Sequence, residues 1–118
     1  MTEAEIQNQI LRALPMDLCR AWRANTGVAA HGKRVVAYGL KGQADISGIL
    51  NDGRRLEIEV KSATGRQSPE QRAFQGMIEA HHGIYILARS VADAIDGIHR
   101  AVRHRPQREG QDPEASRG

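Results

Sequence analysis

Residues 43–61 constrain the fold of this chain more than any other segment, because they form two β-like runs around a turn. The turn is Asn51-Asp52-Gly53, and these residue types favour a tight connection between antiparallel strands. Beyond it, apolar and charged residues alternate strictly, as in a strand that has one face in the core. The apolar residues are Leu56, Ile58 and Val60, and the charged residues are Glu57, Glu59 and Lys61. We therefore predict a β-hairpin with a charged, largely acidic face.

The length of the turn decides which side chains of this hairpin face each other. In a three-residue loop with Gly53 in the left-handed conformation, Asp45 lies opposite Glu59 on the charged face. The other pairs in this register are Leu50 with Arg54, Ser47 with Glu57, and Gln43 with Lys61. A two-residue loop would instead place Asp45 on the face opposite Glu59. We predict the first register, although the sequence permits both.

Helices and further strands are predicted on both sides of the hairpin. Apolar periodicity and capping residues favour a helix over 3–14 after the cap Thr2, a second from Pro69 after the cap Ser68, and a third after the cap Ser90. On the second helix, the stripe expected to face the core is Ala73, Phe74, Met77 and Ile78. Strands are expected within 18–27, 34–39 and 84–88, with a glycine-containing connection over 27–34. The order α-β-β-β-β-α-β-α indicates an α/β fold, with a mixed β-sheet flanked by helices.

The length and composition of the chain fit one small domain. Its 118 residues, of which 40% are hydrophobic, are enough for a modest core. We place the domain at 1–102, because residues 103–118 lack apolar periodicity and are rich in charge, which predicts a disordered tail. The formal net charge of +3 is too small to identify a polyanionic partner. A single cysteine, a charged N-terminal segment and the lack of a long apolar run predict a soluble intracellular protein without a disulfide, a signal peptide or a membrane span.

The charged strand face has a plain explanation, since most such faces are exposed to solvent. Asp45 changes this interpretation, because two directly opposed carboxylates cost a hairpin up to about 1 kcal/mol unless a cation lies between them. Asp45 and Glu59 are therefore candidate ligands for Mg²⁺ or Mn²⁺, with the backbone carbonyl of Val60 as a third donor. Lys61, on the same face, can orient or help deprotonate a water molecule and stabilise charge on a pentavalent phosphorus. This combination fits hydrolysis of a phosphodiester.

Residues outside the hairpin are candidates for the same site or its surroundings. The helical phase places Glu3 rather than Glu5 on the stripe that packs inward, so Glu3 is the better candidate for an extra metal ligand. Glu57 is expected at a solvated rim, and Trp22 is expected in the core rather than as a platform for bases. Side chains that can contact phosphate, or serve as ordinary polar groups on the surface, are Arg23, Asn25, Lys33, Arg34, Lys41, Arg66 and Arg72. A zinc site is not expected in a chain with one cysteine and no histidine spacing typical of zinc.

Three ordered segments resemble the PD-(D/E)xK nuclease superfamily and, within it, the stand-alone VRR-NUC domains of phages and bacteria. Asp45 followed by Glu59-Val60-Lys61 is similar to the D…ExK signature. Residues 38–48 (YGLKGQADISG) resemble the glycine-flanked aspartate segment, and residues 65–71 (GRQSPEQ) resemble the glutamine-containing segment after the lysine. The resemblance covers about residues 1–100. It departs from the family at Ala44, where the position before the aspartate is often proline.

The resemblance implies a restriction-endonuclease-like fold and metal-dependent cleavage of DNA, often of branched or flapped DNA in replication, repair or recombination. Residue by residue, it implies that Asp45 and Glu59 bind the metal and that Lys61 is the catalytic lysine. It also implies that Gln71 is the motif glutamine near the site and that Glu3 is the acid of the N-terminal helix. A homodimer is expected, because symmetric cutting needs two active sites and one compact domain offers one. The expected compartment is the cytoplasm of a bacterium or of a phage-infected cell.

Two other functions are compatible with the same residues. The chain can be a catalytically inactive DNA-binding module with this fold, although a full D…ExK set argues against that. It can also be a small interaction protein whose acidic strand is simply solvated. DNA cleavage with Mg²⁺ or Mn²⁺ would support the nuclease, and DNA binding without turnover would support the binding module. The interaction protein would be favoured if these ions left Asp45 and Glu59 unperturbed.

Overall fold

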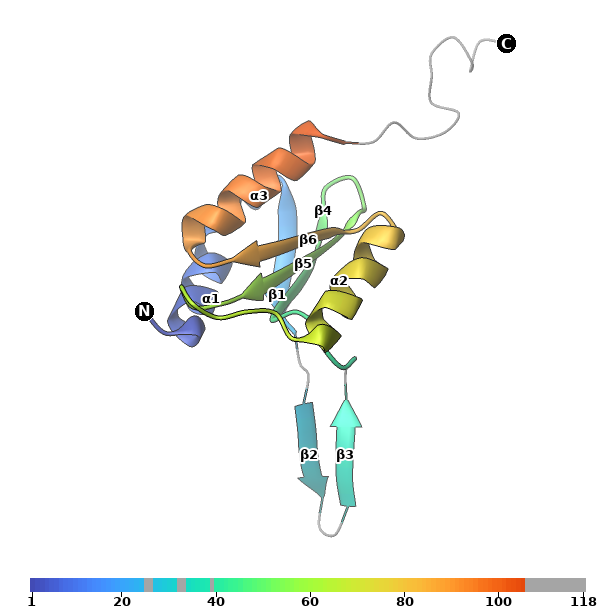
Figure 1. Cartoon of the computed structure of the whole chain (residues 1–118). Helices are drawn as coiled ribbons and strands as arrows, with labels where there is room; N and C mark the ends of the chain where they lie inside the picture. Colours follow the sequence, from blue (N-terminus) through green and yellow to red (C-terminus); the bar gives the residue numbers. More distant parts are fainter. Residues whose placement is uncertain (25–26, 32–33, 39, 106–118) are drawn as a thin grey trace, which may run out of the picture.

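The computed structural model describes residues 1–24, 27–31, 34–38 and 40–105, and it describes side chains only outside the segment 25–39. A four-stranded sheet has helices on both faces, and a separate two-stranded hairpin extends away from it (Figure 1). This arrangement confirms the predicted α/β fold with a mixed sheet flanked by helices.

Three helices and six strands are present in the described part of the chain. The helices are α1 (Glu3–Ala13), α2 (Pro69–Ala80) and α3 (Val91–Arg103). The strands are β1 (Cys19–Arg23), β2 (Gly27–His31), β3 (Arg34–Tyr38), β4 (Ile46–Leu50), β5 (Arg55–Val60) and β6 (Ile84–Ala88). β2 lies where the sequence indicated a connection, so the observed order contains one strand more than predicted. β2 is paired antiparallel with β3, and the residue pattern of β2 alone does not predict this pairing.

The four-stranded sheet has the strand order β1-β4-β5-β6. β1, β4 and β5 pair antiparallel, whereas β6 lies parallel to β5 because the chain crosses over through α2. One face packs on α1 and α3 through the main core, in which Ile10, Ile58 and Ile98 have no exposed surface. The other face is covered in part by α2, through a small cluster around Phe74 and Ile78. The polar side chains of the sheet therefore gather on the α2 side.

The hairpin of β4 and β5 has the predicted register. The Leu50 amide donates to the Arg54 carbonyl at 2.9 Å, and Gly53 has a φ of +94°, as a three-residue bulged loop requires. The paired residues are Ile46 with Ile58, Ser47 with Glu57, Gly48 with Leu56, and Ile49 with Arg55. Continued by one residue, this register brings Asp45 opposite Glu59.

Each helix begins at the capping residue that the sequence predicted. The side-chain oxygens of the three caps accept a hydrogen bond from the backbone amide three residues later. The caps are Thr2 for α1, Ser68 for α2 and Ser90 for α3. The core stripe of α2 is narrower than predicted, because Met77 is 38% exposed and Ala73 is also exposed. The helix covers only part of its sheet face, so two of its positions, Phe74 and Ile78, are enough to bury it there.

The C-terminal helix extends slightly beyond the predicted end of the domain. α3 reaches Arg103, and the side chain of Arg105 donates to the Asn51 side-chain oxygen at 3.1 Å. The predicted disorder of the tail concerns residues that, from 106 onward, lie outside the described part of the chain. Within the described residues, no helix combines the length and the apolar character that crossing a membrane would need.

Candidate metal and catalytic site

Asp45 lies directly before β4, where a backbone amide of β5 and the amide that follows β1 hold it in place. Its Oδ2 accepts a hydrogen bond from the Val60 amide at 2.8 Å. Its carbonyl accepts another from the Ala24 amide, also at 2.8 Å. The carboxylate is thus fixed against the end of β5, beside Glu59.

Glu59 is buried, with only 2% of its surface exposed. Its Oε1 accepts a hydrogen bond from Gln71 Nε2 at 3.1 Å and lies 3.8 Å from Lys61 Nζ. Its Oε2 is buried and has no hydrogen-bond partner among the described residues. A buried carboxylate oxygen without a partner costs free energy, so this atom is positioned to bind a cation.

The environment of Glu59 raises the pKa of its carboxyl from the ordinary 4.5 to about 8. Burial is the largest cause, followed by the charge and hydrogen bonding of Asp45 and then by the more distant charge of Glu3. The Lys61 ammonium opposes this shift but does not cancel it. The ionised form of Glu59 is therefore disfavoured in this site, and a cation bound between Glu59 and Asp45 would favour it.

The N-terminal turn of α2 positions Gln71. Its Oε1 accepts from the Ser68 amide at 2.8 Å, while the Ser68 hydroxyl accepts from the Gln71 amide at 3.1 Å, which forms a capping box. This leaves Nε2 of Gln71 free to donate to Glu59. The structure therefore brings together Asp45, Glu59, Lys61 and Gln71 as the sequence predicted.

Glu3 lies close to this group, at the first turn of α1. Its Oε1 accepts a hydrogen bond from the Ser62 amide at 3.1 Å, directly after Lys61 in the chain. Glu3 and Glu5 are both exposed, so burial does not distinguish them, but the hydrogen bond to Ser62 places Glu3 beside the loop that carries Lys61. In this position Glu3 connects α1 to the loop after Lys61 by a hydrogen bond. Its role as a metal ligand stays a prediction.

The prediction that Glu57 lies at a solvated rim is wrong. Glu57 is fully buried, because its two oxygens accept from Ser47 Oγ at 2.8 Å and from Arg55 Nε at 2.7 Å. These partners compensate its charge without water. Glu57 thus lies two residues before Glu59 on the same face of β5, and its two oxygens already have hydrogen-bond donors, whereas one oxygen of Glu59 has none among the described residues.

The prediction that Trp22 belongs to the core is also wrong. Its side chain is 53% exposed on β1, the edge strand of the sheet. Trp22 pairs with Ser47, whose hydroxyl faces Glu57, so the indole lies on the same face as the acidic pair. α2 covers only part of this face, which leaves the β1 side of it open.

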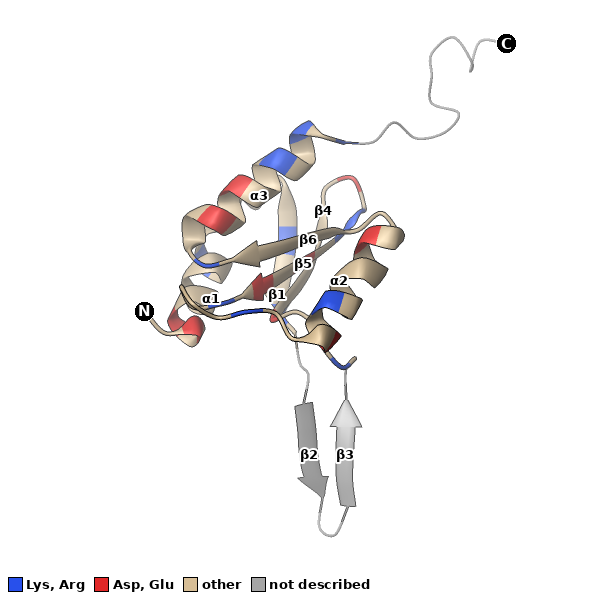
Figure 2. Cartoon of the chain, in the orientation of Figure 1, with Lys and Arg blue, Asp and Glu red and all other residues tan. Residues whose placement is uncertain are grey.

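The basic candidates lie in different environments. Arg23 pairs with Ile46, which faces the main core, and its guanidinium is held by the side chains of Gln7 and Asn8 in α1. It is therefore turned away from the acidic pair. Lys41, Arg66 and Arg72 are exposed around the start of α2. Lys and Arg mark the loop before α2 and α2 itself in Figure 2, near the acidic end of β5.

Two of these exposed cations have partners. Lys41 Nζ lies 3.6 Å from Glu70, and Arg72 donates to the Gln67 carbonyl at 3.1 Å. Both remain on the surface, so DNA contact stays a prediction for them. The side chains of Asn25, Lys33 and Arg34 lie outside the described part of the chain.

Arg89 is a residue of the site region that the sequence did not single out. It follows β6 and donates from Nη1 to the carbonyls of Ser62 at 2.5 Å and Gly65 at 2.8 Å. It thus holds the loop after Lys61 through two carbonyls, whereas Glu3 holds the same loop through the Ser62 amide. The available signal was its place directly after a buried strand, which in a parallel pair ends at the same edge as the strand that carries Lys61.

The donor set suits a hard divalent cation. Asp45 and Glu59 offer carboxylate oxygens, and the orphaned Oε2 of Glu59 is the atom that most needs a positive partner. The described residues contain no group of three or more His, Cys, Asp or Glu gathered closely enough to hold a metal ion. The fit of Mg²⁺ or Mn²⁺ therefore rests on the facing pair.

Neither the known protein families nor the curated proteins that were compared with this chain contain a match to it.

Proposed function

We propose that this protein is a metal-dependent DNA nuclease that uses Mg²⁺ or Mn²⁺. The observation that carries the proposal is the pairing of Asp45 with Glu59, in which a buried carboxylate oxygen lacks a partner among the described residues while Lys61 lies 3.8 Å away. Two facing acids can hold a divalent cation, and a lysine beside them can stabilise the charge that develops during phosphodiester hydrolysis. The sequence resemblance to PD-(D/E)xK nucleases supports the same function.

Each residue of the proposed site has a different role. Asp45 and Glu59 would hold the cation, with the Val60 carbonyl as a further donor, and the cation would supply Lewis-acid stabilisation of the phosphoryl oxygens. Lys61 would orient the attacking water and stabilise the negative charge that develops on phosphorus. Gln71 holds the Glu59 carboxylate in its orientation through the 3.1 Å hydrogen bond.

The substrate that we propose is DNA of branched, flapped or junction type, in the cytoplasm of a bacterium or of a phage-infected cell. Arg66 and Arg72 lie on the exposed surface around the start of α2, and a phosphate backbone would contact such side chains without reading sequence. Lys41 would add to this surface. These contacts would supply affinity, which should fall steeply with salt.

The test is a cleavage panel of linear, flapped and four-way DNA with defined Mg²⁺ or Mn²⁺. We expect wild-type protein to cut at least one substrate, and Asp45→Asn and Lys61→Ala to lower the rate about 100-fold or more, because each removes charge stabilisation from the reacting phosphate. Glu79→Gln, on the exposed part of α2, is the matched control and should leave the rate unchanged. Metal-independent binding without any cleavage would identify the chain as a DNA-binding module instead. Wild-type protein that neither binds nor cuts these DNAs would contradict both functions.

A further inference from the structure

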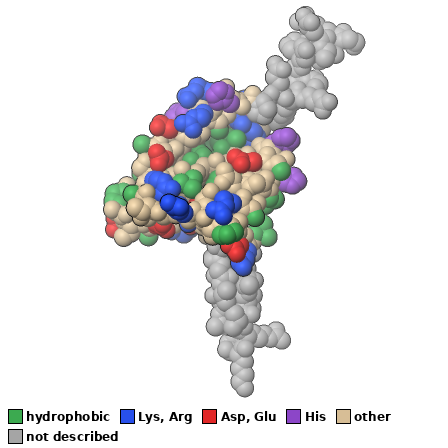
Figure 3. Space-filling view, viewed as in Figure 1, with side chains coloured by type: hydrophobic (Ala, Val, Ile, Leu, Met, Phe, Trp, Pro, Cys, Tyr) green, Lys and Arg blue, Asp and Glu red, His purple; other side chains and the backbone are tan. Residues whose placement is uncertain are grey.

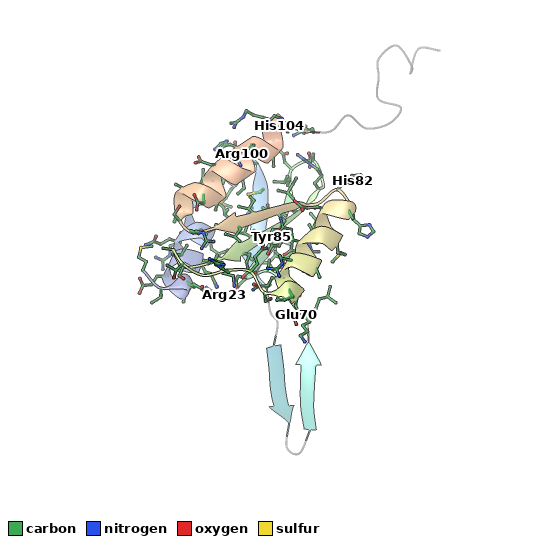
Figure 4. The ribbon with its side chains drawn as sticks, in the orientation of Figure 1. Arg23, Glu70, His82, Tyr85, Arg100 and His104 are labelled. Carbon is green, nitrogen blue, oxygen red and sulfur yellow. The ribbon has the colours of Figure 1, made fainter. Side chains whose placement is uncertain are left out.

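A hollow of about 630 Å³ lies between α2 and the segment that precedes β4. Its described walls come from the middle and end of α2, from Leu40 and Gln43 in that segment, and from Arg55 at the start of β5. In Figure 4, Glu70 and His82 mark the two ends of this helix. Figure 3 shows hydrophobic side chains at the edge of the molecule, below the histidines at the C-terminal end of α2. The described lining includes none of the residues assigned to the metal and catalytic site.

Large apolar side chains that remain exposed form much of the wall of this hollow. Leu40 is 60% exposed and Met77 is 38% exposed, and both share the hollow with the buried ring of Phe74. Exposed apolar side chains that gather in one place mark a binding surface. Methionine suits such a surface, because its flexible thioether adapts to the shape of a ligand and makes favourable contacts with aromatic rings. The hollow is therefore suited to a flat, apolar group.

A buried hydrogen-bond network holds the polar groups of the hollow in place. Glu57 accepts from Arg55 Nε at 2.7 Å and from Ser47 Oγ at 2.8 Å. Gln43 Nε2 donates to the same hydroxyl at 3.4 Å, while Gln43 Oε1 accepts from the Leu40 amide at 3.2 Å. The Arg55 side chain is oriented in this way although 53% of it is exposed. Among the described residues, no hydrogen bond engages its terminal nitrogens, so they can bind an anion.

The charged side chains around the hollow are basic. Arg55 and His81 line it, and none of its described lining residues is acidic. Arg20 lies on the same face of the sheet, because it pairs with Ile49 on β4, which in turn pairs with Arg55 on β5. A ligand that matches both the apolar walls and these cations has a flat apolar body and a negative charge. A nucleotide has this chemistry.

We propose that the hollow binds one unpaired nucleotide of the DNA, with its base between Leu40 and Met77 and its phosphate on Arg55. This inference rests on the proposed nuclease function. Gln43 lies two residues before Asp45, a span of at most about 7 Å, so a nucleotide close to the phosphate at the acidic pair can reach the hollow. A base within a duplex must leave its stack to enter, which costs free energy, whereas a base in a flap or at a junction is already unpaired. The hollow thus favours branched DNA over plain duplex.

Other occupants match the hollow less well. Residues 106–118 of this chain contain no large apolar side chain that could fill it. An apolar segment of a partner protein would contact the walls but would leave the charges of Arg55 and His81 without a counterpart. Charge complementarity therefore favours a nucleotide.

The experiment is an NMR titration that does not depend on DNA cleavage. The chain has three methionines, Met1, Met16 and Met77, so selective methyl labelling gives one signal for each. The probe is a single-stranded thymidine tetranucleotide, added without divalent cations. We expect the Met77 signal to shift and saturate while the Met16 signal stays in place. An abasic tetranucleotide with the same phosphates should bind at least about fivefold more weakly, because the contacts of the bases are lost.

A pair of matched variants tests the same site through the fluorescence anisotropy of a labelled tetranucleotide. Met77→Ala should raise the Kd at least about fivefold, because it removes one wall of the hollow. Met16→Ala makes the same change at an exposed methionine outside the described lining and should leave the Kd unchanged. Circular dichroism should show that both variants are folded.

The possible outcomes separate this inference from the nuclease function. An unshifted Met77 signal, an abasic strand that binds equally well, or equal Kd values for the two variants overturns the nucleotide site and favours a protein segment as the occupant. DNA cleavage by the same wild-type protein would leave the nuclease function intact in each of these cases. Saturable binding at Met77 by a protein that cuts no DNA would instead overturn the nuclease function and retain the nucleotide site.

Discussion

At the scale of single residues, the ionisation of Glu59 is the property that most affects how stability depends on pH. The pKa of this carboxyl is raised to about 8, first by burial and then by Asp45, whereas in the unfolded chain it titrates near 4.5. Between these values the folded protein binds the proton more tightly than the unfolded chain does. The contribution of Glu59 to stability is therefore fully present below pH 4.5 and is lost as the pH rises toward 8.

Glu59→Gln should remove this pH dependence. Without divalent cations, we expect wild type to lose stability as the pH rises from 4.5 to 8, because Glu59 ionises. The variant should not show this loss, since the amide cannot ionise, so the difference in the free energy of unfolding should shift in favour of the variant. Urea unfolding followed by circular dichroism measures this difference. Mn²⁺ should stabilise wild type at pH 8 and leave the variant nearly unaffected, because a ligand stabilises only the state that binds it. A difference in the free energy of unfolding between wild type and variant that does not change with pH would contradict the assigned environment of Glu59.

At the scale of elements, two turns with positive φ determine how Asp45 reaches Glu59. Gly53 closes the hairpin at φ +94°, and a Cβ at this position would meet no atom of the described residues within 4 Å. Gly42 has φ +80°, and a Cβ there would lie 2.3 Å from the Glu70 carbonyl oxygen. The first turn sets the register, and the second packs the segment before Asp45 against the start of α2.

Three glycine-to-alanine substitutions should therefore have different effects. Gly53→Ala should cost about 1–2 kcal/mol of stability from backbone strain alone. Gly42→Ala should cost more and should weaken metal binding, because the clash displaces the segment that leads into Asp45. Gly76→Ala, inside α2 and in open space, should stabilise the protein by about 0.5–1 kcal/mol. Urea unfolding and Mn²⁺ titration measure these effects, and equal costs at all three positions would refute the assignment.

At the scale of the whole molecule, α2 covers only part of its sheet face, and the uncovered part continues toward β1. Trp22, the one tryptophan of the chain, is exposed there and pairs with Ser47, two residues from Asp45. A DNA strand with its phosphate at the acidic pair would pass close to this indole.

DNA binding should therefore change the intrinsic fluorescence of the protein. We expect quenching when flapped DNA is added to Lys61→Ala with Mg²⁺ present, since that variant should bind without cutting and bases quench an indole on which they stack. Trp22→Phe supplies the blank and should lower the affinity. Binding seen by gel shift with no change in fluorescence would place the DNA on another surface.

Sequence alone determined the parts of this protein that depend on contacts within a few residues. The Asn51-Asp52-Gly53 turn and the alternation that follows it predicted the hairpin and favoured the observed register, although a two-residue loop with the same glycine remained compatible with the sequence. The caps of the helices were predictable for the same reason, since each is one side chain that binds an amide three residues away.

The tertiary structure decided which of these residues are buried and what they bind. Glu57 and Glu59 follow the same alternation in the sequence, yet Glu57 accepts hydrogen bonds from Ser47 and Arg55, while one oxygen of Glu59 has no hydrogen-bond donor among the described residues. The exposure of Trp22 likewise follows from how much of the sheet α2 covers. Arg89 reaches the loop after Lys61 only because a crossover makes β6 parallel to β5. These outcomes depend on the packing of segments far apart in the chain, and local pattern carries no information about that packing.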